Sequence, residues 1–463
     1  MTEPIFSRHL TAWLIHVRRQ IFLDMTGGIV IGRLLRSPIV TGSLLGWVSR
    51  IAQMAFQVLS VRMVISTLGT DAYAGVVLIS GLLGWVGSVE FGFSYGLMNT
   101  VSVRKAKGEN DGGLRLFAIF CYVGFSLLGI LLSFLVSPFL ADRFLAAVPY
   151  TNRIELLGIS CAILVMVSTA NIGNRLLFAD QKVFLYYVLS LASTALSLIA
   201  ILLLYLGILP GRIDVVIAAM FVPQALVGLA SLALSVKGLK FALPDPEELK
   251  ETALVSLKFL LLNFLTLITV QTDTFVISQL LSAREIATYG IYTKLFTAMN
   301  LLVTTPLSIL WPRFSAHAAR GERTPMRKLL TSYLLVSMSI MAAFGIFIYL
   351  FGGWIVGILA PHQNIIPPPY FVLCLTLLQL SILWTGGFHT AGLSMSVLTP
   401  ALILTPIQAV ISLASAWILA RHFGLIGVTG GILLSYLVLA VWVSPLIVRM
   451  AVRRYVVAPQ PKA

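Results

Sequence analysis

The stretch that decides the fold is Val183–Ile208, VFLYYVLSLASTALSLIAILLLYLGI, in which no acidic or basic residue occurs over 26 positions. A helix of this length exceeds the hydrocarbon thickness of a bilayer, about 30 Å, because each helical residue adds about 1.5 Å. The whole chain is also rich in apolar residues and poor in charged ones, since 58% of its residues are apolar and 11% are charged. Soluble domains carry about 25% charged residues. We therefore predict an integral membrane protein.

Apolar stretches of similar length occur on both sides of this one. The twelve predicted spans are 43–67, 73–99, 116–140, 154–174, 183–208, 213–236, 254–281, 286–310, 329–355, 370–391, 400–420 and 425–448. Turn signals such as Leu209-Pro210-Gly211 separate them. The predicted fold class is an all-α, polytopic membrane protein with about twelve transmembrane helices.

The basic residues indicate how the chain is oriented. With the N-terminus in the cytoplasm, 23 of the 32 Lys and Arg residues fall in cytoplasmic segments and 5 in the opposite loops. Because cytoplasmic loops of membrane proteins are enriched in Lys and Arg, this bias predicts that both termini are cytoplasmic. The net charge of +15 is spread over many segments rather than gathered on one face. We therefore expect no nucleic-acid partner.

An internal repeat divides the chain into halves. The segment Ser102–Glu109, SVRKAKGE, recurs 213 residues later as Ser315–Glu322, SAHAARGE, and six spans separate the two copies. An even number of spans gives halves of the same topology, which is the plan of many transporters. We predict two six-helix lobes. The predicted segments are a cytoplasmic or interfacial N-terminal segment 1–42, an N-lobe 43–236, a cytoplasmic linker 237–253, a C-lobe 254–448 and a cytoplasmic tail 449–463.

Six ionisable residues fall well inside the predicted spans, where each charge costs about 2.5–3.5 kcal/mol at a helix centre. They are Arg50, Arg62, Glu90, Lys258, Asp273 and Lys294. All six lie on the first two helices of a half, which predicts one polar cleft between the halves. Four are basic and two are acidic, a balance that favours a phosphate or pyrophosphate ligand over a cation.

The cleft residues have different predicted roles. Arg50, Arg62, Lys294 and Lys258 are the predicted substrate-binding residues, although Lys258 lies close enough to the cytoplasmic end for its ammonium group to reach the interface. Glu90 and Asp273 are candidates for ion pairing or for coupling. Glu90 could pair with Arg50 in a purely structural contact, and Asp273 could pair with a basic neighbour.

Signals for catalysis are missing from the sequence. It has no phosphate-binding loop of the form Gly-x-x-x-x-Gly-Lys-Ser/Thr, its six histidines show no zinc spacing, and its three cysteines are scattered through apolar stretches. The predicted outer loops are too short for an extramembrane catalytic domain. We expect a transporter rather than an enzyme, with no metal and no cofactor apart from a coupling ion such as H⁺ or Na⁺.

Several motifs carry a family resemblance. They are Val89–Met98 (VEFGFSYGLM), Arg104–Glu109 (RKAKGE), Thr272–Leu281 (TDTFVISQLL), Ala287–Tyr292 (ATYGIY) and Leu310–Ser315 (LWPRFS). In these motifs and in its layout, the chain resembles the polysaccharide and O-antigen repeat-unit flippases of the multidrug/oligosaccharidyl-lipid/polysaccharide (MOP) exporter superfamily.

This resemblance implies a two-lobed fold that moves an undecaprenyl-pyrophosphate-linked oligosaccharide across the bacterial inner membrane by alternating access. It further implies membrane lipids and other polysaccharide assembly proteins as partners. Two alternatives remain open at this point. One is a cation-coupled multidrug exporter of the same superfamily, with Asp273 as the coupling residue. The other is a membrane-embedded glycan polymerase or ligase.

Overall fold

The architecture is that of an all-helical membrane protein. A computed structural model describes residues 38–107, 110–148, 150–180, 182–237, 246–247, 250, 271–319, 322–361, 367–394 and 399–457, and no strand occurs among them. The elements are α3 (Pro38–Lys107), α4 (Gly112–Phe144), α5 (Arg153–Ala179), α6 (Val183–Tyr205), α7 (Ile213–Val236), α9 (Thr272–Leu280), α10 (Ala283–Ala319), α11 (Arg323–Leu359), α12 (Phe371–Ser394), α13 (Thr399–Ser435), the π-helical turn η1 (Tyr436–Ala440) and α14 (Val441–Val457).

The spans agree with the predicted ones. Eight helical segments in the described part of the chain are long and apolar enough to cross a membrane. Two of them, Leu45–Val86 and Ile403–Met450, are 42 and 48 residues long, about twice what one crossing needs. Each contains a glycine with a positive φ, Gly69 at 81° and Gly424 at 55°, where the chain turns. Counted as two crossings each, and together with α10, these segments account for eleven of the twelve predicted spans. The remaining one, 254–281, is described only from residue 271 on, where it contains the short α9.

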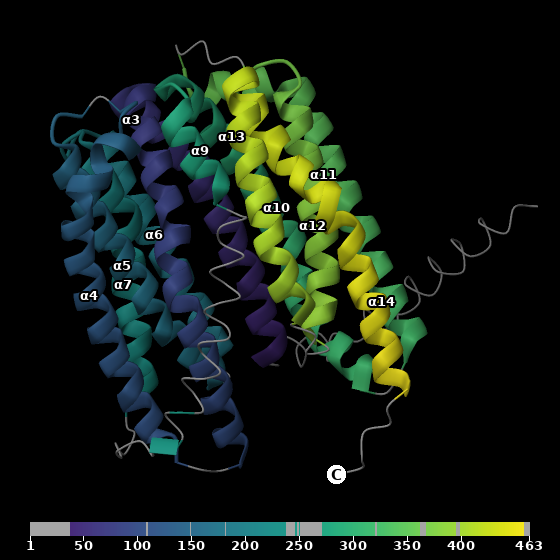
Figure 1. The fold of residues 1–463 in the computed structure, drawn as a ribbon. Coiled ribbons are helices and arrows are strands. Elements are labelled where there is room, and N and C mark those ends of the chain that lie inside the picture. Colours follow the sequence, from purple (N-terminus) through teal and green to yellow (C-terminus); the bar gives the residue numbers. More distant parts are fainter. Residues whose placement is uncertain are drawn as a thin grey trace, which may run out of the picture.

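The helices form two bundles (Figure 1). In the first, α5 lies at the centre and contacts α3, α4 and α7, while α6 packs against α3 and α7. In the second, α12 contacts α10, α11, α13 and α14. The bundles meet mainly where α3 packs against α10. The predicted lobe boundaries stay a prediction, because the linker 237–253 and the N-terminal segment fall largely outside the described residues.

The outward surface of the bundles is apolar. Helix α4 lies at the edge of the first bundle (Figure 1), and Leu131 and Phe139 are among its exposed side chains. In the second bundle, Leu350 and Trp354 of α11 are exposed in the same way. Exposed apolar side chains of this size are unfavourable in water and favourable against lipid tails, so these faces fit a bilayer.

Close helix packing inside the first bundle depends on glycine. A Cβ on Gly173 of α5 would lie 2.3 Å from the backbone nitrogen of Leu232 and 2.7 Å from the carbonyl oxygen of Gly228, both on α7. A Cβ on Gly228 would in turn lie 2.5 Å from the Cβ of Ala170. Small residues at such crossings let helix backbones approach each other in membranes.

We expect Gly173→Ala to destabilise the protein by about 1–3 kcal/mol, because the new methyl group overlaps backbone atoms that can move only if α5 and α7 separate. Gly124→Ala and Gly353→Ala are matched controls, since nothing lies within 4 Å of a Cβ at either position. Thermal unfolding of the purified proteins measures the effect. Equal melting temperatures for Gly173→Ala and the two controls would show that the contact between α5 and α7 is not tight.

Candidate functional site

The candidate site is a cavity of about 660 Å³ between the two bundles, lined by residues of α3, α5, α6 and α7 on one side and of α9 and α10 on the other. We call the end of the molecule that holds residues 104–107, 110–115, 180 and 182 the inner end. This end is predicted to face the cytoplasm. The opposite end, where α4 finishes and α10 begins, is the outer end.

The bundles touch directly on the outer side of the cavity. A Cβ on Gly81 or Gly84 of α3 would overlap the side chains of Thr274 and Gln271, respectively. A Cβ on Gly290 of α10 would lie 2.2 Å from Val77 of α3. The ribbons of the two bundles accordingly converge at the outer end and diverge toward the inner end in Figure 1.

A hydrogen bond joins the bundles at the outer end itself. Gln279 Nε2 of α9 donates to the carbonyl oxygen of Arg143 of α4 at 3.0 Å. The outer side of the cavity is thus closed by direct contacts between side chains and backbone of the two bundles.

Three of the six predicted cleft residues line this cavity: Arg50, Asp273 and Lys294. Arg50 lies 19 residues before Gly69, about 28 Å from the outer end, whereas Lys294 lies 11 residues into α10, about 16 Å from it. The two cations therefore occupy different depths. Arg50 is closer to the inner end, and Lys294 is closer to the contacts that close the outer end.

These three charges form no ion pair with another described residue. Arg50 Nη1 donates a 3.4 Å hydrogen bond to Gln53 Oε1, and Lys294 Nζ lies 5.3 Å from the centre of the Tyr73 ring. A cation over an aromatic face is stabilised without being neutralised. No carboxylate among the described residues therefore neutralises either cation.

The described partners of Asp273 are uncharged polar groups, whereas the sequence had left open a pair with a basic neighbour. Its carboxylate accepts hydrogen bonds from the Tyr289 hydroxyl at 2.5 Å and from the backbone nitrogen of Thr274 at 2.6 Å. The residue lies in the first turn of α9, where the helix dipole favours a negative charge.

The prediction that Arg62 lies in the cleft is wrong. Arg62 does not line the cavity, and its side chain is exposed. It follows Gln53, which does line the cavity, by nine residues, and at about 100° per residue that places it on the opposite face of α3. It also lies within two turns of Gly69 at the outer end, so its guanidinium can reach the membrane interface.

Two further predictions cannot be compared with the structure. Lys258 falls outside the described residues, and Glu90 belongs to α3 but its side chain is not described. The predicted contact between Arg50 and Glu90 therefore stays a prediction.

The cavity lining also contains a set of uncharged polar residues that the search for buried charges missed. We call it the neutral wall, and it comprises Ser168, Asn171 and Asn174 of α5, Ser190, Ser193, Thr194 and Ser197 of α6, and Gln224 of α7. The four α6 residues lie at positions i, i+3, i+4 and i+7, which is one helix face. In the sequence, this stripe of polar residues lies within the apolar stretch Val183–Ile208. It was the signal from which the neutral wall could have been predicted.

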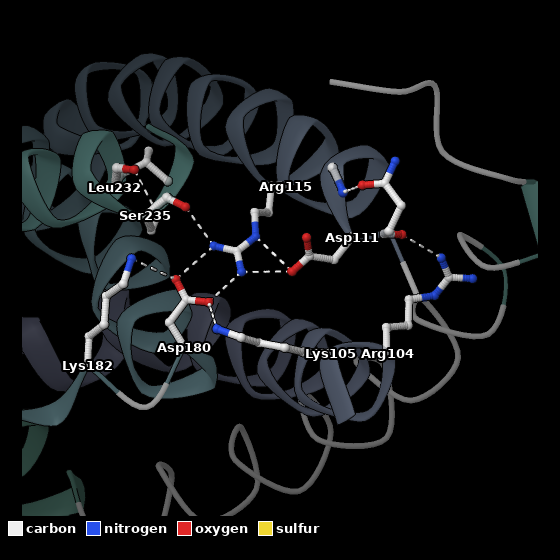
Figure 2. Close-up of polar contacts among 10 residues, drawn as sticks. Arg104, Lys105, Asp111, Arg115, Asp180, Lys182, Leu232 and Ser235 are labelled. Atoms are coloured by element: carbon white, nitrogen blue, oxygen red, sulfur yellow. Dashed lines mark hydrogen bonds and ion pairs between the residues drawn. The ribbon is translucent and has the colours of Figure 1, made fainter. Parts of the chain in front are cut away.

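A second polar cluster, also missed, joins the helix ends of the first bundle at the inner end (Figure 2). The Arg115 guanidinium of α4 makes five hydrogen bonds, one for each of its N–H groups. Its acceptors are the carboxylates of Asp111 and Asp180 and the carbonyl oxygen of Ser235, at 2.6–3.1 Å. Lys105 adds a contact to Asp180 at 2.9 Å. We call this cluster the Arg115 clamp.

Asp180 follows the last residue of α5, outside the spanning segment. Burial by itself would raise its pKa, but hydrogen bonds from Arg115 and Lys105 outweigh burial and lower the pKa from 3.8 to about 2. Because the pKa of Asp180 is lower in the folded protein than in the unfolded protein, its ionised carboxylate stabilises the fold fully at pH values above the unfolded-state pKa. This stabilisation is lost as the pH falls through the folded-state pKa. The Arg115 clamp therefore stays charged at every physiological pH.

Similarity to known proteins now identifies the family. Residues 40–318, more than half of the chain, match the model of the family described as polysaccharide biosynthesis protein. The chain belongs to this polysaccharide biosynthesis protein family. A protein of Yersinia pseudotuberculosis, provisionally named an O-antigen export protein, is 26% identical over 420 residues, covering 89% of this chain and 95% of that protein. A provisionally named O-antigen transporter of Salmonella typhimurium is 25% identical over 425 residues, covering 89% and 97%.

Solved structures of other proteins have the same fold as this family member. An inward-facing multidrug resistance MATE transporter of the MOP superfamily superposes with a TM-score of 0.70 at 16% identity, covering 87% of this chain and 95% of that chain. The lipid II flippase MurJ, in an inward closed conformation, superposes with a TM-score of 0.64 at 15% identity and 90% coverage of both chains. The polysaccharide biosynthesis protein described here thus shares the fold of these two transporters.

We expect Arg115→Ala to destabilise this family member by about 3–5 kcal/mol, because it leaves the Asp180 carboxylate, 4% exposed, without its main partner. The matched control is Arg212→Ala, since Arg212 forms an exposed pair with Asp214 and should leave stability unchanged. Thermal and denaturant unfolding of the purified variants measure both effects. An Arg115→Ala protein as stable as Arg212→Ala would contradict the role of the Arg115 clamp.

Proposed function

We propose that this chain is a flippase that moves an undecaprenyl-pyrophosphate-linked oligosaccharide from the inner to the outer leaflet of the bacterial inner membrane. The observation that carries the proposal is the cavity between the bundles, which presents Arg50 and Lys294 without ion-pair partners among the described residues. Guanidinium and ammonium groups are the side chains that bind phosphate groups. The names of the O-antigen relatives support the same substrate class.

Alternating access would account for the movement. The bundles are in contact on the outer side of the cavity, and the cavity lining extends from there toward the inner end. With the inner end in the cytoplasm, this arrangement is the one that admits a ligand from the inner leaflet. Rocking the bundles about the contact between α3 and α10 would separate Gly81 from Thr274 and Gly290 from Val77, and would open the outer side.

A second candidate function rests on Asp273. A carboxylate in a cavity between two bundles could bind a proton, Na⁺ or an organic cation, as expected of a cation-coupled multidrug exporter. Its hydrogen bonds to Tyr289 and Thr274 show that polar partners are in place around it. Two cations against one carboxylate in the described lining favour an anionic ligand, so the flippase is the function that we propose.

We expect Arg50→Ala and Lys294→Ala each to reduce export of the lipid-linked oligosaccharide by about tenfold or more, because a hydrogen bond to a charged group contributes about 1.5–3 kcal/mol. The measurement is surface polysaccharide in cells that depend on this chain, at matched protein levels. Arg62→Ala is the matched control, since Arg62 lies on the opposite face of α3, and it should export normally. Normal export by Arg50→Ala and Lys294→Ala would contradict the proposal that these two residues bind the substrate.

For the second candidate, we expect overproduction of the chain to leave the tolerance of cells to organic cations unchanged, because the cavity charge repels them. The measurement is growth inhibition in a strain that lacks its own multidrug exporters. Resistance that disappears with Asp273→Asn and persists with Arg50→Ala would favour the drug exporter over the flippase.

A further inference from the structure

We propose that the neutral wall of the cavity is a glycan-binding subsite, in which Asn171, Asn174 and Gln224 hydrogen-bond the sugars while the cations hold the pyrophosphate. This inference rests on the proposed function and adds to it the residues that recognise the sugar part of the substrate. It assigns the two chemical parts of one ligand to two different surfaces of the same cavity.

The first argument is the chemistry of the wall. Within the described lining, α5, α6 and α7 contribute amides, hydroxyls and apolar side chains but no acidic or basic residue. A charged group would therefore find no counter-charge on these three helices. An uncharged, polyhydroxylated group finds both donors and acceptors, because each Asn or Gln side chain carries two N–H donors and one carbonyl acceptor.

The second argument is the hydrogen-bonding capacity that the protein leaves unused. Asn174 Nδ2 donates to Asn171 Oδ1 at 3.0 Å, and Gln224 Nε2 donates to the carbonyl oxygen of Met220 at 3.0 Å. These bonds order the side chains and leave the Asn171 amide nitrogen and the Asn174 and Gln224 carbonyl oxygens for a ligand. Ser168, only 2% exposed, lines the cavity, and its Oγ has no partner among the described residues.

The third argument is the presence of aromatic rings among these amides. Phe56, Phe221 and Tyr186 line the same cavity. Tyr186 is fixed by ring contacts to Phe178 at 4.5 Å and to Tyr187 at 5.1 Å between centroids. The apolar faces of sugar rings pack against aromatic rings, and a few polar groups in an aromatic and apolar lining are typical of ligand sites.

The fourth argument is the length of the wall. Asn174 lies 21 residues into α5, about 31 Å from the outer end, and Gln224 lies 11 residues into α7, about 16 Å from it. The wall therefore extends over about 15 Å of depth, and Arg50 and Lys294, about 12 Å apart in depth, both lie within this interval. This interval accommodates more than one sugar ring beside either cation.

Binding of two matched lipids to the full-length chain in nanodiscs tests the inference. One probe is the pool of glycan-bearing polyprenyl pyrophosphates extracted from cells that produce the polysaccharide, and the other is glycan-free undecaprenyl pyrophosphate. The variants are Asn174→Leu and Gln224→Leu, on two different helices. The matched control is Gln408→Leu, because Gln408 of α13 is also a membrane-embedded amide with an unpartnered nitrogen but lies outside the cavity lining.

We expect the unmodified chain and Gln408→Leu to bind the glycan-bearing pool about tenfold more tightly than the glycan-free lipid. Asn174→Leu and Gln224→Leu should lose most of this factor and still bind the glycan-free lipid normally. Equal affinity of the unmodified chain for both probes, or an equal loss for both probes in the variants, would overturn the glycan subsite alone. Failure of the unmodified chain to bind either probe would overturn the proposed function together with it.

Discussion

A bilayer core offers no hydrogen-bond partner to a polar side chain, and the arrangement of this protein depends on that constraint. The exposed faces of α4 and α11 are apolar, as Phe139 and Trp354 illustrate. The polar faces of α5, α6 and α7 point instead toward α3, α9 and α10, where they enclose a cavity of about 660 Å³. The cavity is therefore a direct consequence of burying polar helix faces in a membrane, and it is the natural place for a polar ligand to cross.

Contacts within the first bundle differ in kind from contacts between the bundles. Within the bundle, Gly173 brings the backbones of α5 and α7 together, and the Arg115 clamp ties the inner ends of the helices with charge-assisted hydrogen bonds. Between the bundles, the outer contact consists of small residues against single side chains, such as Gly290 against Val77. A firmly tied bundle that meets its neighbour through such contacts is suited to move as one body.

Most of the fold could be predicted from the sequence, because hydropathy and the spacing of basic residues reflect the membrane directly. The twelve spans follow from apolar stretches alone, and Arg50, Asp273 and Lys294, which the cost of buried charge singles out in the sequence, line one cavity. Arg62 was misplaced because hydropathy assigns a residue to a span but not to a face. At 100° per residue, nine positions are enough to reverse the side that a residue faces.

The remaining parts of the site needed three-dimensional contacts. Arg115 and Asp180 are 65 residues apart, and nothing in the local sequence indicates that they meet. The neutral wall left a weak signal in the sequence, the polar stripe from Ser190 to Ser197. A search for ionisable residues inside spans does not select such uncharged residues. The charged residues thus indicate which class of headgroup the cavity binds, and the neutral residues better indicate which group is attached to that headgroup.

Photo-crosslinking in living cells tests most directly whether the cavity carries the lipid-linked glycan. A photoreactive residue would replace Ser193, which lines the cavity, or Leu196, an exposed residue of the same helix that is not part of the cavity lining. The account predicts that the probe at position 193 captures a glycan-bearing polyprenyl lipid, detected by mass spectrometry, and that the probe at position 196 captures phospholipid alone. Capture of the same phospholipids at both positions, with no glycan at position 193, would contradict it.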